Sequence, residues 1–519
     1  MTRRRLVVVG NGMAGARFVE NLIASDRDRE FEIVVFGDEP HGNYNRILLS
    51  GVLAGTHRSE DIMINPLEWY ADNGVRLHAG TRVEGLELGH RVVRGANGVS
   101  EPYDLLVLAT GSRPTVPPIH GLRTATGELK EGVFVFRTLE DCQGIMARAQ
   151  SAHRAIVVGG GLLGLEAARG LRNRGLEVQV VHLTRTVMDT QLDPQGGRIL
   201  QRQLEQMGLG ILTARSTAAV LGDTSVTGVR FADDEEVACD MIVVTAGIRP
   251  NIELAKAAGL AIDRGVLVGD DLACDGHDNV FAIGECSEHR GCVYGLVAPL
   301  WEQAQILADR LTARPDARYT GSQTTTKLKV AGLDVAVMGV KDPLDENDEI
   351  VSYAEPARGI YKKLILHENR LVGAILIGDG PGVPAIAQAF MHAAPLAARR
   401  SDILFPLDKD VPVRKPEEMS DDTQICDCNA VAKARIVDAV LRGATSLHSV
   451  GERTRAGTGC GSCKPEVQRV IDLAMRSMDE PELLQSVAPR EEPPNPAAAR
   501  VTVDGPSASS NASASHANA

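Results

Sequence analysis

Four of the nine cysteines lie close together late in the chain, as a C-x-C pair and a C-x-x-C pair. The first pair is Cys426 and Cys428, and the second is Cys460 and Cys463. Thiolates are soft ligands that suit iron–sulfur clusters and zinc. Structural zinc sites prefer two C-x₂₋₄-C pairs, and a C-x-C pair is tighter than these. The pattern predicts a ligand set, with an iron–sulfur cluster, zinc and redox disulfides as the alternatives.

The segment between the two cysteine pairs, NAVAKARIVDAVLRGATSLHSVGERTRAGTG, has the apolar spacing of two short amphipathic helices. We therefore expect a small helical module over residues 422–478. Residues 480–519 are rich in Pro, Ala, Ser and Asn. Such a composition buries too little apolar surface to order itself, so this segment is predicted to be a disordered tail.

A different chemistry is indicated near the start of the chain. The apolar run RRRLVVV ends in Gly10, Gly12 and Gly15, a helical pattern follows, and a second apolar strand closes on Asp38 and Glu39. Glycines at this spacing let a pyrophosphate approach a helix N-terminus, where unpaired N–H groups favour negative charge. An acid after the second strand can accept ribose hydroxyls. The segment therefore predicts a dinucleotide site.

The same unit recurs with Gly159, Gly161 and Gly164. Two units imply two dinucleotides, one on each Rossmann-like domain. Strands that end at Thr110–Gly111 and Gly284–Glu285 bracket the second unit. We expect an α/β chain with a discontinuous first domain, a second domain inserted in it, a small α+β domain and the helical module. The expected bounds of the first three are 1–118 with 250–315, 119–249, and 320–408.

Composition excludes several classes of partner. The net charge of −13 argues against nucleic acid or an anionic membrane surface. The chain has no run of about 18 apolar residues, which a membrane-spanning helix needs. The basic opening leads directly into an apolar strand and a glycine turn, unlike a signal peptide. An odd number of cysteines without secretion signals indicates a reducing, cytoplasmic setting.

Together these landmarks resemble the two-dinucleotide flavoproteins with a pyridine-nucleotide disulfide reductase-like fold. The resemblance is strongest to the NAD(P)H-oxidising portion of assimilatory nitrite reductase large subunits and to nitrate reductase electron-transfer subunits. It rests on HGNYNRILLSGVLAG, TTTKLKVAGLDVA, FAIGEC and the terminal cysteine pattern. It covers roughly residues 5 to 475.

The resemblance implies that FAD binds to the first unit. Its contacts would be Gly10, Gly12, Gly15, Asp38 or Glu39, Arg46, Thr110, Gly111, Gly284 and Glu285. Of these, Glu285 stands where the family has an aspartate beside the ribityl–phosphate region. No cysteine precedes Cys142. The segment NRILLSG therefore offers no thiol to the flavin, and electrons are expected to leave within the chain.

NAD(P)H would bind to the second unit through Gly159, Gly161 and Gly164. Glu166, in the first turn of the following helix, is the catalytic candidate that would orient the nicotinamide. His182 and Arg185 stand where an acid that reads the ribose is expected. The sequence therefore does not distinguish NADH from NADPH.

The terminal module resembles the bacterioferritin-associated ferredoxin-like domain, which implies a 2Fe–2S cluster on the four clustered cysteines. Because FAD takes an electron pair and such a cluster passes electrons singly, the module would be the electron exit. The expected acceptor is a separate catalytic protein, a molybdenum nitrate reductase or a sirohaem nitrite reductase, and a homodimer is compatible with this. Two alternatives are a stand-alone ferredoxin- or rubredoxin-type reductase of a monooxygenase system, and a zinc-containing regulatory flavoprotein.

Overall fold

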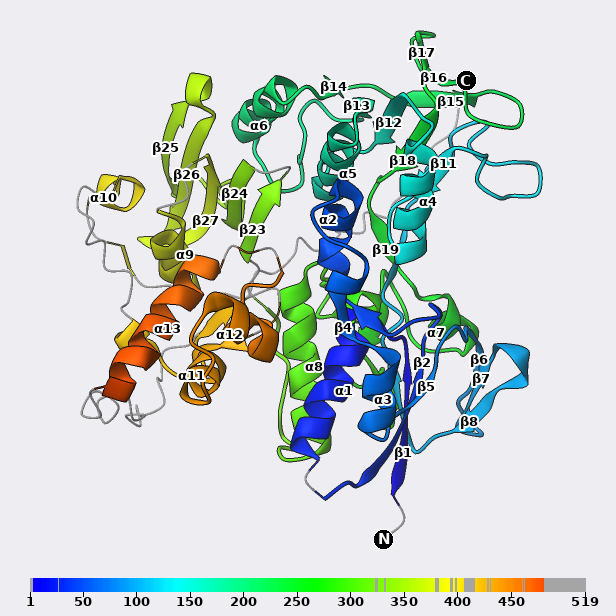
Figure 1. Cartoon of the computed structure of the whole chain (residues 1–519), viewed down its shortest axis with the longest axis vertical. Coiled ribbons are helices and arrows are strands. Elements are labelled where there is room, and N and C mark those ends of the chain that lie inside the picture. The colour runs from blue at the N-terminus through cyan, green and yellow to red at the C-terminus, as the bar shows by residue number, and fades with distance from the viewer. Residues whose placement is uncertain are drawn as a thin grey trace, which may run out of the picture.

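The structure of the chain is a computed structural model that describes residues 3–26, 28–322, 325–330, 333–378, 382–392, 395–396, 399–405, 416–426, 429, 431–459, 461 and 463–479. Cys428, Cys460 and the tail expected over 480–519 lie outside the described residues. Figure 1 shows the two parallel-sheet units one above the other, with the small domain and the orange cysteine module beside them.

The first unit is built on a parallel sheet in the order β21-β9-β1-β2-β5. Its strands are near-continuous apolar runs, as strands covered on both faces must be. Strand β21 comes from the chain after the second unit, so both parts of the chain share one core. The sheet and its main helices are β1 (Arg4–Val9), β2 (Phe31–Phe36), β5 (Arg76–His78), β9 (Leu105–Leu108), β21 (Val280–Ala282), α1 (Met13–Ser25), α3 (Leu67–Asp72), α7 (Glu253–Ala257) and α8 (Val297–Leu311).

The connections of the first unit carry shorter elements. The segment NRILLSG forms a 3-10 turn, η1 (Arg46–Leu48), that leads into helix α2 (Leu49–Ala54). The remaining strands are β3 (Asn43–Tyr44), β4 (Met63–Asn65), β6 (Val83–Glu87), β7 (Val92–Gly95), β8 (Ser100–Pro102), β20 (Val266–Val268) and β22 (Ser287–His289).

The second unit repeats the plan with a parallel sheet in the order β11-β18-β12-β13-β14. An antiparallel pair, β10 with β19, connects it to the first unit. The elements are β10 (Ser112–Pro114), β11 (Val133–Val135), α4 (Leu139–Ala149), β12 (Arg154–Val158), α5 (Leu162–Asn173), β13 (Glu177–Val181), α6 (Pro194–Gln206), β14 (Gly210–Leu212), β15 (Thr217–Leu221), β16 (Gly228–Phe231), β17 (Glu236–Ala238), β18 (Met241–Val244) and β19 (Ile248–Pro250).

The small domain has an antiparallel sheet in the order β23-β24-β27-β26-β25. A buried ion pair joins it to the second unit: Lys363 Nζ lies 2.9 Å from Asp193 Oδ2, and the Tyr361 hydroxyl donates to the same oxygen at 2.6 Å. Its elements are β23 (Thr325–Val330), β24 (Leu333–Gly339), β25 (Glu349–Glu355), β26 (Ile360–His367), β27 (Arg370–Ile377), α9 (Val383–His392) and α10 (Ser401–Leu404).

The cysteine module has its own apolar core, which includes Ile436, Val450 and Val470. The two helices expected between the cysteine pairs are present as α11 and α12. The module consists of β28 (Gln424–Cys426), β29 (Val431–Ala432), α11 (Lys433–Leu441), α12 (Leu447–Thr454) and α13 (Lys464–Asp479). Among the described residues, none of the helices combines the length and apolar character that crossing a membrane requires.

Candidate functional site

One continuous cavity of about 2510 Å³ lies between the two parallel-sheet units and extends to the small domain and the cysteine module. Both sheets present the carboxyl ends of their strands to it, which is where open α/β sheets bind ligands. Of the predicted dinucleotide-site residues, these line the cavity: Gly10, Gly12, Asp38, Glu39, Arg46, Thr110, Gly111, Gly159, Gly161, Glu166, Gly284 and Glu285.

The first glycine turn leaves the N-terminus of α1 open to the cavity. Gly10 has φ +117°, and a Cβ there would lie 2.1 Å from the Ala109 carbonyl oxygen. Gly12 has open space around its Cα, and no side chain caps the helix at this residue. Gly15 does not line the cavity. It packs against the backbone of the turn, where a Cβ would lie 2.0 Å from the Gly10 carbonyl oxygen. The free N–H groups of α1 fit a pyrophosphate.

The second glycine turn has the same geometry. Gly159 has φ +126°, with its Cβ position 2.4 Å from the Thr245 carbonyl oxygen. Gly161 is open to the cavity at the uncapped N-terminus of α5. Gly164 packs against the Gly159 carbonyl, at 1.9 Å from its Cβ position, and does not line the cavity. The second turn fits a second pyrophosphate equally well.

Two carboxylates of the first unit are held by arginines. Glu39 accepts hydrogen bonds from Arg46 Nη2 at 2.6 Å and from the Tyr44 hydroxyl at 2.7 Å. Burial opposes ionisation of Glu39, but Arg46, Tyr44 and His41 together outweigh it and hold the Glu39 pKa below its usual value. Arg46 Nη1 also donates to the carbonyl oxygen of Arg137 at 2.8 Å. This fixes the end of β2 against the second unit.

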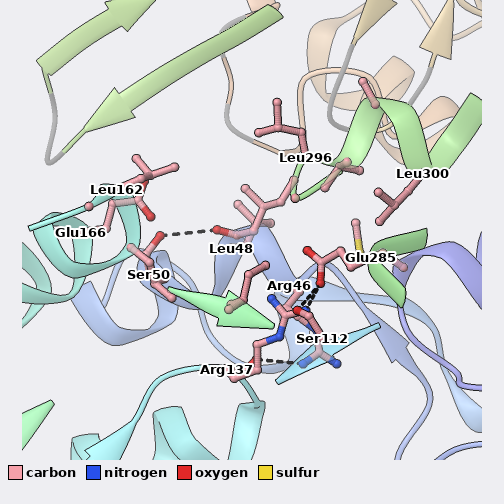
Figure 2. A pocket seen from close by; sticks show the side chains of 18 of the residues that line it. Arg46, Leu48, Ser50, Ser112, Arg137, Leu162, Glu166, Glu285, Leu296 and Leu300 are labelled. Carbon is pink, nitrogen blue, oxygen red and sulfur yellow. Dashed lines mark hydrogen bonds and ion pairs between the residues drawn. The ribbon is translucent and has the colours of Figure 1, made fainter. Parts of the chain in front are cut away.

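Glu285 meets side chains from two other segments, Ser112 and Arg137 (Figure 2). It accepts a hydrogen bond from the Ser112 hydroxyl at 2.6 Å and pairs with Arg137. Among the described residues, Arg137 Nε is buried and has no hydrogen-bond partner. A phosphate or ribityl oxygen in the cavity could accept from it.

Arg137 and Ser112 were not predicted from the sequence as site residues. The signal for Arg137 was present in FRTLED, where a basic residue stands between the apolar strand β11 and the capping box that Thr138 and Asp141 make for α4. A charged side chain at the end of a buried parallel strand points to a ligand site.

Glu166 lies where the two units face each other, in the first turns of α5. Its carboxyl group faces the Ser50 hydroxyl, as Figure 2 shows. Burial raises the pKa of Glu166 to about 7, and the Ser50 hydrogen bond opposes this only in part. The described lining contains one cysteine, Cys463, which belongs to the cysteine module. Cys142 is buried beside α2, with Sγ 3.7 Å from the Leu49 carbonyl oxygen, and does not line the cavity.

The second unit has no acid at the end of its second strand. His182 accepts a hydrogen bond from the Gly160 N–H at 3.1 Å, and its Nε2 lies 3.2 Å from Asp189 Oδ1. Leu183 lines the cavity with 70% of its surface exposed. Arg185 is exposed and is not part of the lining. Arg215 lines this end of the cavity and forms ion pairs with Asp233 and Glu235, each at 2.7 Å.

Two of the four clustered cysteines fall within the described residues. Cys426 is fully buried at the end of β28, and Cys463 is partly exposed just before α13. Cys463 lines the cavity together with Gly459 and Gly461. These two soft thiol donors lie in one small core with Cys463 at its edge. This arrangement fits a cluster that exchanges electrons with a group bound in the cavity.

Comparison with sequence families gives three matches. The pyridine nucleotide-disulphide oxidoreductase family matches residues 4–306, which is more than half of the chain. The rubredoxin NAD+ reductase C-terminal domain matches residues 325–391. The BFD-like [2Fe-2S] binding domain matches residues 424–472, and so includes all four clustered cysteines.

The chain is also similar to individual proteins. It is 40% identical over 479 residues to "Nitrite reductase [NAD(P)H]" of Bacillus subtilis, covering 92% of this chain and 58% of the relative. It is 40% identical over 472 residues to "Assimilatory nitrate reductase electron transfer subunit" of the same organism, covering 91% and 60%. The chain thus spans about three fifths of the length of these relatives.

Among solved structures, the chain is similar to the covalent putidaredoxin reductase–putidaredoxin complex, with a TM-score of 0.71. The identity is 24%, and the match covers 80% of this chain and 98% of that one. This likeness supports the two-unit fold predicted from the sequence.

Proposed function

Because the chain belongs to the pyridine nucleotide-disulphide oxidoreductase family, we propose that it oxidises NAD(P)H and feeds the electrons to a separate catalytic protein of nitrate or nitrite assimilation. The chain is an NAD(P)H-dependent FAD oxidoreductase with a 2Fe–2S domain. The names of the two Bacillus subtilis relatives support the choice of pathway. The iron–sulfur match disfavours the zinc-containing regulatory alternative, because zinc does not pass electrons.

One observation carries this proposal: a single cavity is lined by both glycine turns and by Cys463. Bound FAD would accept a hydride from NAD(P)H, and the 2Fe–2S cluster would accept electrons one at a time. One NAD(P)H thereby gives NAD(P)+, one proton and two electrons, which reduce two one-electron acceptors. The two dinucleotides would lie in this one cavity with the cluster at its edge, so the electrons would pass from NAD(P)H to the cluster without a second protein.

The chain's own residues would bind and orient these groups. We propose that the α1 N-terminus at Gly12 holds the FAD pyrophosphate, with Asp38 or Glu39 near its ribose. Arg46, the Thr110–Gly111 turn, Gly284 and Glu285 would contact the rest, and Arg137 Nε would donate to an oxygen of the same cofactor.

The second unit would hold NAD(P)H in the same way. The α5 N-terminus at Gly161 would bind its pyrophosphate. Glu166 would orient the nicotinamide, since its carboxyl group lies beside the Ser50 hydroxyl at the face between the two units. A carboxyl group with a raised pKa keeps a proton to donate near neutral pH. We propose that Cys426, Cys428, Cys460 and Cys463 ligate the cluster.

The proposal is tested by finding which protein accepts the electrons. NAD(P)H oxidation is followed anaerobically with nitrate or nitrite, with and without a molybdenum nitrate reductase or a sirohaem nitrite reductase catalytic protein. We expect oxidation that depends on the oxyanion only when a catalytic protein is present. Cys463→Ser should abolish it while the flavin is still reduced, and Cys292→Ser, at an exposed cysteine away from the cavity, should leave it intact.

Reduction of an added ferredoxin or rubredoxin, together with no electron transfer to either catalytic protein, would contradict the proposal. It would instead favour the stand-alone reductase of a monooxygenase system.

A further inference from the structure

Three charged side chains join the cysteine module to helix α1 of the first unit. Arg455 of the module donates from Nη1 to Glu20 Oε1 at 2.8 Å. Arg17, one turn before Glu20, donates from Nη1 to Glu20 Oε2 at 3.1 Å. Arg17 also donates from Nη2 to the carbonyl oxygen of Asn429 in the module. The Glu20 carboxylate therefore bridges two guanidinium groups, one from each side of the contact.

The surroundings of these three residues, which we call the latch, are closely packed. Arg455 Nη2 donates to Asn65 Oδ1 at 3.0 Å, and Asn65 Nδ2 donates to Glu20 Oε1 at 2.8 Å. The side chains of Arg17 and Glu20 are only 10% and 16% exposed. A void beside them measures about 10 Å³, which is at most the room of one water molecule. Arg17 also lies over the Trp301 ring, 4.6 Å from its centre.

The charges of the latch depend on one another. Burial opposes ionisation of Glu20, but Arg455 and Arg17 outweigh it and lower the Glu20 pKa. Removal of one partner from a buried ion pair leaves an uncompensated charge, and this strongly weakens the contact. The contact is therefore expected to fail when either Glu20 or Arg455 is replaced.

The backbone of Arg455 has a conformation that is uncommon for a residue with a side chain. Arg455 caps the C-terminus of α12 with φ +68°, in the left-handed region that favours glycine. A non-glycine residue persists in such a conformation when its surroundings hold it there. Its carbonyl oxygen accepts a hydrogen bond from Asn429 Nδ2 at 2.7 Å. Asn429 directly follows Cys428, and Arg455 precedes Cys460 by five residues, so the latch adjoins the chain segments of both cysteine pairs.

An apolar contact completes the interface on the cavity side. Ile47, between Arg46 and Leu48 in η1, lines the cavity and also packs against the core of the cysteine module. Ile47 and the latch thus hold the module at two places on the first unit. Contacts at two places restrict both the distance and the tilt of a docked domain.

We propose that Arg17, Glu20 and Arg455 are positioning residues that fix the cysteine module against the first unit and so set the rate at which electrons reach the cluster. This inference rests on the proposed function. NAD(P)H would supply an electron pair through FAD. The cluster would take one electron at a time, with one ferric iron becoming ferrous, and would pass it to the acceptor before it takes the second. Transfer over a fixed short path is fast, and a loosely held module would spend less time at that distance.

The test uses Arg455→Gly in the full chain. Glycine suits the left-handed backbone at this position, so the variant removes the ion pair of Arg455 with Glu20 without straining α12, while the contact of Arg17 with the Asn429 carbonyl stays. Arg453→Met is the matched control, since Arg453 is exposed and, within the part of the chain that the structure describes, its side chain bonds only to the Arg442 carbonyl inside the module. Glu20→Gln is a second variant, on the α1 side. Rapid mixing with NAD(P)H separates flavin bleaching from cluster reduction, and hydrogen–deuterium exchange follows α1 and α12.

We expect Arg455→Gly and Glu20→Gln to slow cluster reduction by about tenfold or more, with flavin reduction unchanged. Exchange in α1 and α12 should increase in both variants, and Arg453→Met should behave as the wild type. Unchanged exchange, or increased exchange with an unchanged rate of cluster reduction, would overturn the inference. A wild-type cluster that NAD(P)H never reduces would instead refute the proposed function, while exchange would still report whether the latch holds the module.

Discussion

The two parallel-sheet units place matching residues at matching positions, yet use them differently. The glycine turns at Gly10 and Gly159 share their left-handed backbone and the close approach of a facing carbonyl. Two residues beyond the third glycine, the first unit has Arg17 and the second has Glu166. Arg17 faces the cysteine module, whereas Glu166 faces Ser50 and the cavity. The shared turn thus fits phosphate in both units. In our proposals the next helical turn serves docking in the first unit and chemistry in the second.

The units also differ at the end of the second strand. Phe36 and Val181 occupy equivalent positions, because each pairs with the last residue of the first strand. Counting onward, Asp38 of the first unit corresponds to Leu183 of the second. An acid there can accept ribose hydroxyls, and a leucine cannot. The glycine turn that fits phosphate is common to both units, but the residue placed to contact the ribose differs.

The largest effect is expected from a substitution that blocks the glycine turn of the first unit. Gly12 has an ordinary negative φ and open space around it, so Gly12→Val should fold but place its methyl groups where the pyrophosphate binds. We expect FAD affinity to fall by about 100-fold, or about 2.8 kcal/mol. Flavin content after purification measures this. Gly85→Val, at an equally open glycine in β6, is the control, and normal flavin content in Gly12→Val would refute the placement.

The same substitution in the second unit should separate the two sites. Gly161→Val should retain FAD, but its KM for NAD(P)H should rise by about tenfold to 100-fold. Reduction of the bound flavin by dithionite should be normal, because that reductant needs no nucleotide site. Loss of flavin from Gly161→Val would mean that the two cradles are not independent.

Glu166 should make stability depend on pH in a way that Arg17 does not. Its pKa of about 7 in the folded chain lies above the ordinary value of 4.5, so its contribution to stability is complete below about pH 4.5 and is lost as pH rises through 7. Glu166→Gln should therefore flatten the fall in the free energy of unfolding between pH 5 and pH 8, as followed by urea unfolding. An unchanged slope would show that the carboxyl group titrates normally.

The smallest effect is expected where the strand ends differ. Leu183→Asp gives the second unit the acid that the first has, at an exposed position where the fold should tolerate it. The ratio of kcat/KM for NADH to that for NADPH should rise by about tenfold, because a carboxylate accepts the 2′-hydroxyl and repels a 2′-phosphate. A ratio that stays the same would place the ribose elsewhere.

Local patterns were sufficient to predict much of this molecule. Glycine spacing after an apolar strand predicted both turns, since a left-handed backbone beside a facing carbonyl admits only glycine, and periodicity predicted α11 and α12. The fold class and the three cofactors predicted from the sequence are supported by the family matches.

Contacts between units were not predictable in the same way. Arg17 and Asn429 are 412 residues apart, and no local pattern links them. Arg137 was missed although FRTLED carries a local signal, because its partners, Glu285 and Arg46, come from distant parts of the chain. The sequence placed His182 and Arg185 where a residue that contacts the ribose was expected. The strand register shows instead that Leu183 is the residue equivalent to Asp38.

The most direct test of the central claim is a visible spectrum with iron and sulfide analysis, on anaerobically purified protein before and after addition of NADH or NADPH. The account predicts bleaching of the flavin bands, about two irons and two sulfides per chain, and a cluster that is reduced as well. Zinc in place of iron, with only the flavin reduced, would contradict it.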